Sequence, residues 1–130
     1  MTVVVGLMAT PEGRAALERA ADEAVVRSLP LVLVETARPA PDEESRAAME
    51  SLVAELTATV QAGGLTVERR RPEGKDLAEQ LVGVAEDTRA SCLVIGLRRR
   101  SPVGKLILGS SAQRILLDAT CPVLTVKPIR

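Results

Sequence analysis

The sequence predicts an α/β fold, a doubly wound sheet of five parallel strands with helices on both faces. Short apolar segments rich in β-branched residues, typical of strands buried on both faces, alternate along the chain with longer segments of helical periodicity. Each connection between strands is long enough to cross a face of the sheet, so we expect parallel strands and right-handed crossovers. The length of 130 residues predicts one domain over residues 1–130.

The first strand is predicted at residues 2–8, and a helix follows within residues 9–29. Thr10 is a residue type that caps helices, Pro11 suits the first turn, and Glu12 complements the positive end of a helix. One face of this helix carries small and apolar residues at helical spacing and is expected to be buried: Ala16, Leu17, Ala20, Ala21 and Ala24.

A second strand is predicted at 29–37, and the proline and acidic residues of 38–45 indicate a surface loop. The next helix is predicted from about Asp42 to Ala62, because Gly63 and Gly64 are typical helix stops. Its apolar residues recur at helical spacing and predict the buried stripe: Met49, Leu52, Val53, Leu56 and Val60.

The third strand is predicted at residues 65–71, where apolar and polar residues alternate only as far as Glu68. The polar end of this segment indicates a short strand at an edge of the sheet. Asp76 and Glu79 have the spacing of a capping box and predict the start of the third helix. Its inward residues are expected to be Leu77, Leu81 and Val84.

The fourth strand is predicted at residues 91–97 and is followed by a loop that contains three consecutive arginines. A fourth helix is predicted from about Ser110, with a fifth strand at 121–128. The helix has apolar positions at helical spacing, which are Ala112, Ile115, Leu116 and Ala119.

Composition excludes several kinds of chemistry. The chain has no Phe, Trp or Tyr, which excludes aromatic base-stacking surfaces, and no His, which excludes Ser-His-Asp and Cys-His sites and imidazole zinc sites. Lys+Arg and Asp+Glu both total 17, so no net charge attracts nucleic acid or an anionic membrane. Cys92 and Cys121 are expected to be buried, reduced thiols. Without a signal peptide or membrane span, we expect a cytoplasmic protein without a metal.

The loop after the fourth strand is the best candidate for a ligand site. Doubly wound sheets bind ligands outside the carboxyl ends of their strands, and a helix N-terminus attracts anions. Gly109 would let a phosphate approach the backbone, and Ser110 and Ser111 could donate hydroxyl groups to it. The alternative is that these serines only cap the helix.

Two common phosphate-binding motifs are absent. The pair Gly104 and Lys105 belongs to the P-loop pattern, but that motif requires glycine where Arg99 stands and serine or threonine where Leu106 stands. The GxGxxG dinucleotide motif is also missing after the first strand, where the sequence is GLMATPEG.

The segments VVVGLMATPEGRAALERA and LILGSSAQRILLDATCPVLTVKP, together with the glycine that ends the fourth strand, resemble the universal stress protein family across essentially the whole chain. The resemblance implies the strand order 3-2-1-4-5 and a Rossmann-like, adenine nucleotide alpha hydrolase-like fold. It also implies a cytoplasmic stress-response protein and a homodimer that pairs the edges of its fifth strands. The alternative for that edge is that the residues KPIR at the chain end cover it.

ATP-binding members of this family carry the motif G-x2-G-x9-G-[ST] between the fourth strand and the last helix. Gly96 matches its first glycine, and Gly109 with Ser110 matches its last pair, whereas Arg99 replaces the middle glycine. Met8 stands where these members have an aspartate on the adenine side. Val34 is the second adenine-side position that the resemblance implies.

Arg99 lacks the conformational freedom of glycine, but a guanidinium group is well suited to phosphate oxygens. Arg98, Arg99 and Arg100 could therefore replace backbone donors at the site, the alternative being a solvated basic loop. Arg69, Arg70 and Arg71 form a second basic run three strand spacings away, roughly 14 Å. A long polyphosphate or an acidic protein could contact both runs.

Three functions follow. The first is a non-catalytic stress-response domain that binds an adenine nucleotide such as ATP, or another small anion, weakly at the strand-four loop. The second is a nucleotide-independent dimeric interaction protein with a vestigial site, which Met8 and Arg99 favour. The third is an enzyme that hydrolyses ATP slowly, and it is the least favoured because no carboxylate lies near the loop in sequence. Glu35, at the end of the second strand, could still reach the crevice in space.

Overall fold

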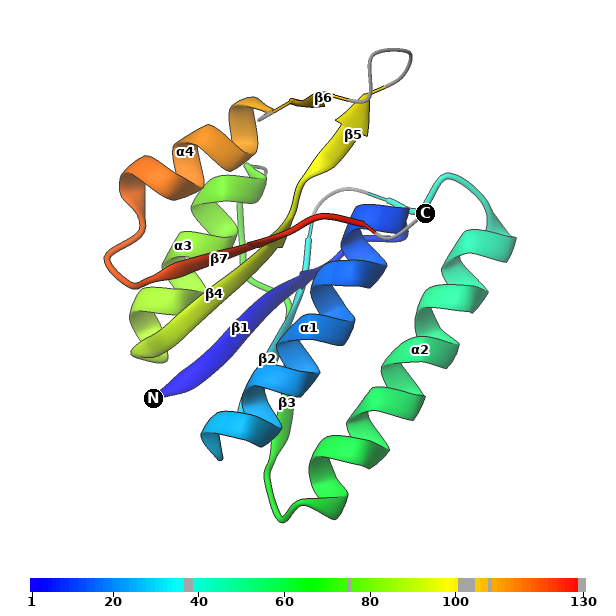
Figure 1. The fold of residues 1–130 in the computed structure, drawn as a ribbon, viewed down its shortest axis with the longest axis vertical. Coiled ribbons are helices and arrows are strands. Elements are labelled where there is room, and N and C mark those ends of the chain that lie inside the picture. The colour runs from blue at the N-terminus through cyan, green and yellow to red at the C-terminus, as the bar shows by residue number, and fades with distance from the viewer. Residues whose placement is uncertain (37–38, 75, 101–104, 108, 129–130) are drawn as a thin grey trace.

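The computed structural model describes residues 1–36, 39–74, 76–100, 105–107 and 109–128. Its centre is a five-stranded sheet with all strands parallel and the order β3-β2-β1-β4-β7 (Figure 1). β7 is the predicted fifth strand, so the expected order 3-2-1-4-5 is confirmed. The strands are β1 (Thr2–Leu7), β2 (Leu31–Glu35), β3 (Val67–Arg70), β4 (Ala90–Gly96) and β7 (Val123–Val126).

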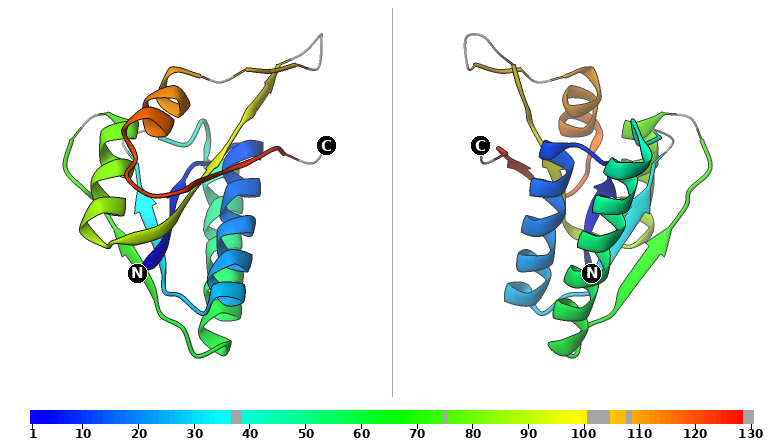
Figure 2. Two further views of the ribbon diagram at one scale, coloured as in Figure 1. Left: turned by 60° about the vertical axis from the view of Figure 1, so that its left-hand side comes forward. Right: turned by 90° about the vertical axis from the view of Figure 1, so that its right-hand side faces the viewer.

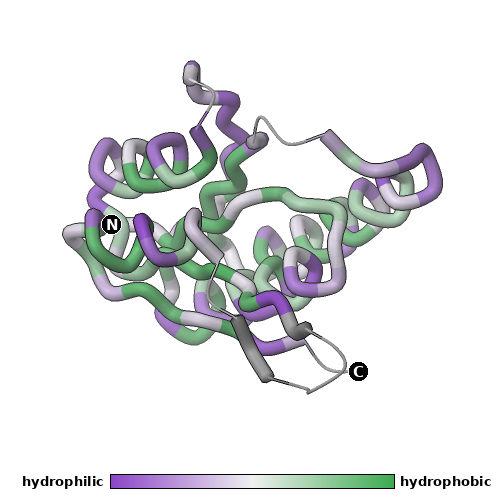
Figure 3. The backbone as a smooth tube through the Cα atoms, turned by 90° about the horizontal axis from the view of Figure 1, so that it is seen from above, coloured by the Kyte–Doolittle hydropathy of each residue, from purple (hydrophilic) through white to green (hydrophobic). Residues whose placement is uncertain are grey.

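Helices cover both faces of this sheet (Figure 2). They are α1 (Pro11–Arg27), α2 (Glu43–Ala62), α3 (Leu77–Asp87) and α4 (Ser110–Asp118). Alternate residues of a strand point to opposite faces, so Val3 and Val5 pack with α1 and α2 whereas Val4 packs with α3. Burial on both faces explains why the central strands are almost wholly apolar, which Figure 3 shows as hydrophobic colour along the sheet.

The helix boundaries agree with the predicted capping signals. The hydroxyl of Thr10 accepts a hydrogen bond from the Gly13 amide at 3.0 Å, and the carboxylate of Asp76 accepts from the amides of Ala78 and Glu79 at 2.9 and 3.3 Å. Gly63 ends α2 as its C-cap. The predicted inner face of α1, from Ala16 to Ala24, is fully buried.

Two expectations for the C-terminal third are wrong. The segment predicted as a loop contains a short antiparallel hairpin, β5 (Arg98–Arg100) and β6 (Lys105–Ile107), which projects beyond the sheet (Figure 1). Its strands have three residues each, too few for a period-two pattern to be detected. Leu116, predicted to face inward, is 41% exposed, and of the residues of α4 only Ile115 is buried. Of the helices in the described ranges, none is long and apolar enough to cross a bilayer.

Candidate functional site

A cavity of about 240 Å³ lies at the carboxyl end of β4. It is next to the boundary between β1 and β4, where the strand order reverses, which is the usual ligand position in such sheets. α1 and α4 contribute their first turns to it, and α3 contributes apolar side chains. The lining residues are Met8, Glu12, Leu77, Leu81, Ile95, Gly96, Leu97, Arg98, Gly109, Ser110, Ser111, Ala112 and Ile115.

The cavity brings together most of the residues singled out in the sequence. Six of them line it: Met8, Gly96, Arg98, Gly109, Ser110 and Ser111. Val34 does not, because its side chain is 0% exposed and packs in the core with Leu81 and Ile95. The side chains of Arg99 and Arg100 lie outside the described part of the structure.

Gly96 is required by packing between β4 and α1. A Cβ atom at this position would lie 2.1 Å from the carbonyl oxygen of Glu12, a distance that no side chain tolerates. The family resemblance assigns Gly96 to nucleotide binding. The structure gives a second reason for glycine here, because it lets the first turn of α1 lie directly on the end of β4.

Gly109 is in a different situation. Its backbone has φ −65° and ψ 166°, which any residue adopts, and no atom of the described residues lies within 4 Å of the position where a Cβ would stand. The protein itself therefore does not need glycine here. What the missing side chain leaves is open space beside the cavity and the first turn of α4.

The N-terminus of α4 presents backbone N–H groups for which the described residues supply no capping side chain. Gly109 is the N-cap and makes no side-chain capping hydrogen bond, and the first helical bond runs from the Gln113 amide to the Gly109 carbonyl at 3.0 Å. The alternative that serines cap this helix is wrong, because Ser110 and Ser111 lie inside its first turn. Their amides precede the first helical bond, so α4 presents N–H groups and serine hydroxyls at the edge of the cavity.

Glu12 and Arg98 are the charged residues in the described lining of the cavity. Arg98 Nε lies 3.7 Å from Glu12 Oε1, and the side chains are 59% and 16% exposed respectively. Glu12 was not predicted as a site residue, because its place in the first turn of α1 is already explained by the helix dipole. Its position four residues after Met8, in the first turn of the helix that follows the first strand, was the available signal.

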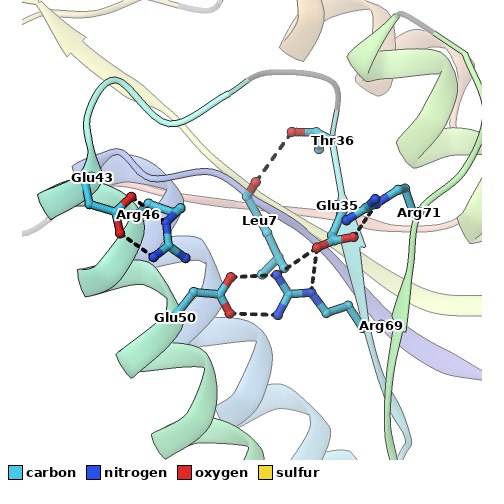
Figure 4. Close-up of polar contacts among 8 residues, drawn as sticks. All are labelled: Leu7, Glu35, Thr36, Glu43, Arg46, Glu50, Arg69 and Arg71. Carbon is cyan, nitrogen blue, oxygen red and sulfur yellow. Dashed lines mark hydrogen bonds and ion pairs between the residues drawn. The ribbon is translucent and has the colours of Figure 1, made fainter.

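The second arginine run lies apart from this cavity and is paired with carboxylates (Figure 4). Arg69 donates two hydrogen bonds to Glu50, at 2.9 and 2.7 Å, and one from Nε to Glu35 at 3.0 Å. Arg71 Nε donates to the other oxygen of Glu35 at 2.7 Å. We call Glu35, Glu50, Arg69 and Arg71 the β2–β3 network.

The β2–β3 network holds its carboxylates in the charged form. Hydrogen bonding from Arg71, reinforced by the charge of Arg69, lowers the pKa of Glu35 below its ordinary value. The hydrogen bond from Arg69 likewise lowers the pKa of Glu50, and the same contact raises the pKa of Arg69. Glu35, considered above as a carboxylate that could reach a ligand, is therefore occupied by two arginines and does not line the cavity.

The arrangement suits an anion attached to a mostly apolar group. The first turn of α4 supplies donors at the cavity edge, while Leu81, Ile95 and Ile115 supply apolar wall. Within the described ranges, no three His, Cys, Asp or Glu side chains cluster as a metal site would require.

Comparison with known proteins places these features in context. Residues 1–127 match the model of the universal stress protein family. A universal stress protein of Mycolicibacterium smegmatis is 42% identical over 126 residues, which is 97% of each chain. Among solved structures, a universal stress protein from Archaeoglobus fulgidus has a TM-score of 0.72 at 29% identity, over 98% of both chains. A universal stress protein in complex with cAMP has a TM-score of 0.71 at 25% identity, over 99% of this chain and 98% of that one.

Proposed function

The chain belongs to the universal stress protein family, and from that membership we propose that its cavity binds an adenine nucleotide or a similar phosphate-bearing anion without catalysing a reaction. In this proposal the protein is a small cytoplasmic regulatory domain of the stress response. Its ligand state would be read by other proteins, and the chain would act as a homodimer.

The observation that carries the proposal is the meeting of two features in one cavity. The uncapped first turn of α4 offers amides and the Ser110 and Ser111 hydroxyls to a phosphate, and the apolar wall behind it suits a base and sugar. The solved relative in complex with cAMP, which covers nearly the whole of this chain, supports a ligand with this chemistry.

Several features indicate weak binding and no turnover. Met8 offers no hydrogen bond of the kind that the family's aspartate makes, and the cavity is smaller than the roughly 300 Å³ at the lower end for ligand pockets. Phosphoryl transfer needs a metal ligand and a residue that orients the attacking group. Among the described lining residues the one carboxylate is Glu12, which already pairs with Arg98.

Absorbance and calorimetry test the proposal. Because the chain has no Phe, Trp or Tyr, a nucleotide that copurifies would dominate the near-ultraviolet spectrum. Isothermal titration with AMP, cyclic AMP and ATP should show saturable binding, and Gly109→Val should weaken it at least about tenfold, or 1.4 kcal/mol, by blocking the approach to α4. A Gly83→Val variant is the control for altered handling, because Gly83 lies within α3, does not line the cavity, and has no described atom within 4 Å of the position of a Cβ. No binding of any of the three nucleotides would refute the proposal.

A second function, a nucleotide-independent interaction protein, is favoured by Met8 in the cavity wall and requires only the dimer. β7 lies at an edge of the described sheet, where the carbonyls of Pro122 and Val126 accept hydrogen bonds from the amides of Leu93 and Leu97 at 3.0 and 2.8 Å. Backbone groups alternate along a strand, so the N–H of exposed Thr125 points away from β4, toward the edge that no other described strand pairs.

Thr125→Pro removes this outward N–H while leaving the hydrogen bonds to β4 at Pro122 and Val126. We expect the wild-type protein to have twice the 13.7 kDa chain mass in light scattering after size exclusion, and Thr125→Pro to have the mass of one chain. Thr125→Val keeps the N–H and should remain dimeric. A wild-type protein that runs as one chain would contradict the dimer.

A further inference from the structure

We propose that Glu12 sets the charge of the ligand that the cavity accepts, favouring nucleotides with one phosphate over those with three. The inference rests on the proposed function, because it concerns the selectivity of the same cavity. It assigns a specificity-determining role to a residue of the α1 first turn that lies outside the glycine motif.

The position of Glu12 is rigidly held. Its carbonyl oxygen covers Gly96 so closely that a Cβ there would come within 2.1 Å, so the first turn of α1 cannot move toward the end of β4. One residue further, a Cβ on Gly13 would lie 2.1 Å from the Met8 carbonyl oxygen, which fixes the same turn against the end of β1. The side chain, only 16% exposed, extends from this anchored backbone into the cavity wall.

The ion pair with Arg98 makes the described cavity wall neutral overall. Glu12 and Arg98 are its charged members, and they face each other at 3.7 Å. This separation is longer than a hydrogen bond, and Arg98 is 59% exposed, so the guanidinium can turn toward a phosphate. The Glu12 side chain is far less exposed and starts from the anchored turn of α1, so its carboxylate has less freedom to turn away from a ligand.

A bound phosphate is therefore attracted by the Arg98 guanidinium, which can turn toward it, and repelled by the Glu12 carboxylate in the cavity wall. Each further negative charge adds repulsion from Glu12, whereas the donors of the α4 first turn and Arg98 are already engaged by the first phosphate. Solvent screening acts over about 8 Å at physiological ionic strength, so a charge on the wall of a cavity this small acts on groups inside it.

The volume of the cavity also favours a nucleotide with one phosphate. Its volume of about 240 Å³ is below the range typical of pockets that enclose whole ligands, roughly 300 Å³ and above. A nucleotide with one phosphate or a cyclic phosphate makes the smallest demand on this space. Volume and charge are independent observations, and both disfavour a triphosphate.

Calorimetric titration of the full chain with AMP, ADP and ATP tests the inference. The wild-type protein should bind AMP more tightly than ATP. Glu12→Gln keeps the shape of the side chain and removes its charge, so we expect affinity to rise about tenfold for ATP and only about threefold for AMP, because repulsion scales with ligand charge. Glu18→Gln, an exposed position on the same helix that does not line this cavity, should leave both affinities unchanged.

The outcomes separate this inference from the proposed function. If Glu12→Gln binds AMP but keeps the wild-type ratio of ATP to AMP affinity, or loses affinity for all three nucleotides equally, Glu12 is not a charge filter although the cavity is a nucleotide site. If no nucleotide binds to wild type or variant, both proposals fail. Arg98→Gln provides a second test, since it should weaken AMP binding in wild type and Glu12→Gln backgrounds alike, and circular dichroism confirms that each variant is folded.

Discussion

The carboxyl edge of the sheet has two halves that differ in what occupies them. Over β2 and β3, the edge is occupied by the protein's own charges, because Arg69 and Arg71 are bound by Glu35 and Glu50 (Figure 4). Over β1 and β4, the edge holds a cavity, and its one arginine with a described side chain, Arg98, makes only a long ion pair. Arg69 and Arg71 of one basic run and Arg98 of the other therefore differ in how closely the fold pairs them with carboxylates.

The difference teaches that a basic run indicates a ligand site only when its counterions are not supplied by the fold. In the β2–β3 network, each guanidinium faces a carboxylate at hydrogen-bond distance, which leaves little reason for an external anion to bind. This argues against a polyphosphate or acidic protein that bridges both runs. At the cavity between β4 and α4, the backbone N–H groups of the α4 first turn have no capping side chain in the described structure.

The largest expected effect is a loss of stability on substitution of Gly96, where β4 packs against α1 beside the cavity. Gly96→Ala should lower the free energy of unfolding by about 3 kcal/mol, because the new methyl group overlaps the Glu12 carbonyl and forces α1 from the sheet. Urea denaturation followed by circular dichroism measures the loss. Gly109→Ala is the matched control and should stay within about 0.5 kcal/mol of wild type, since its surroundings are open. Equal stability of the two variants would show that the junction between α1 and β4 is not tightly packed.

A smaller loss of stability is expected from substitutions in the β2–β3 network. Arg69→Gln should cost about 1 kcal/mol at neutral pH, because Arg69 is partly exposed and solvent screens its pairs with Glu35 and Glu50. Arg70→Gln, which removes only an exposed pair with Glu68, should cost less.

The stability difference between wild type and Arg69→Gln should also depend on pH. The pKa values of Glu35 and Glu50 are lowered in the folded protein, so their contribution is complete above the ordinary value of 4.5 and is lost as the pH falls below it. Urea unfolding at a series of pH values should therefore show the two proteins converging in acid. A constant difference down to about pH 3 would contradict the assigned role of the network.

Much of the fold could be predicted because its signals are local. The apolar runs that became β1, β2 and β4 are long enough to read as buried strands, and Thr10, Asp76 and Gly63 mark helix ends through contacts with near neighbours. The strand order came from the family resemblance, since strand order is not a local property.

What could not be predicted depends on contacts between distant residues. Arg69 meets Glu50 and Glu35 across 19 and 34 residues of sequence, and no spacing rule connects them. The packing reason for Gly96 depends on a carbonyl oxygen 84 residues earlier, at Glu12. Gly96, Gly109 and Ser110, which the motif singled out, line one cavity, but the part of Glu12 in its wall required the three-dimensional structure.

The two close contacts at the start of α1 also bear on how the protein can change shape. Gly13 against Met8 and Gly96 against Glu12 join the end of β1, the first turn of α1 and the end of β4 into one stiff block. α4, with only Ile115 buried among its residues, is attached far more loosely. If the cavity takes up the proposed ligand, we expect α4 to move rather than α1, and because α4 precedes the edge strand β7 the shift would reach that strand.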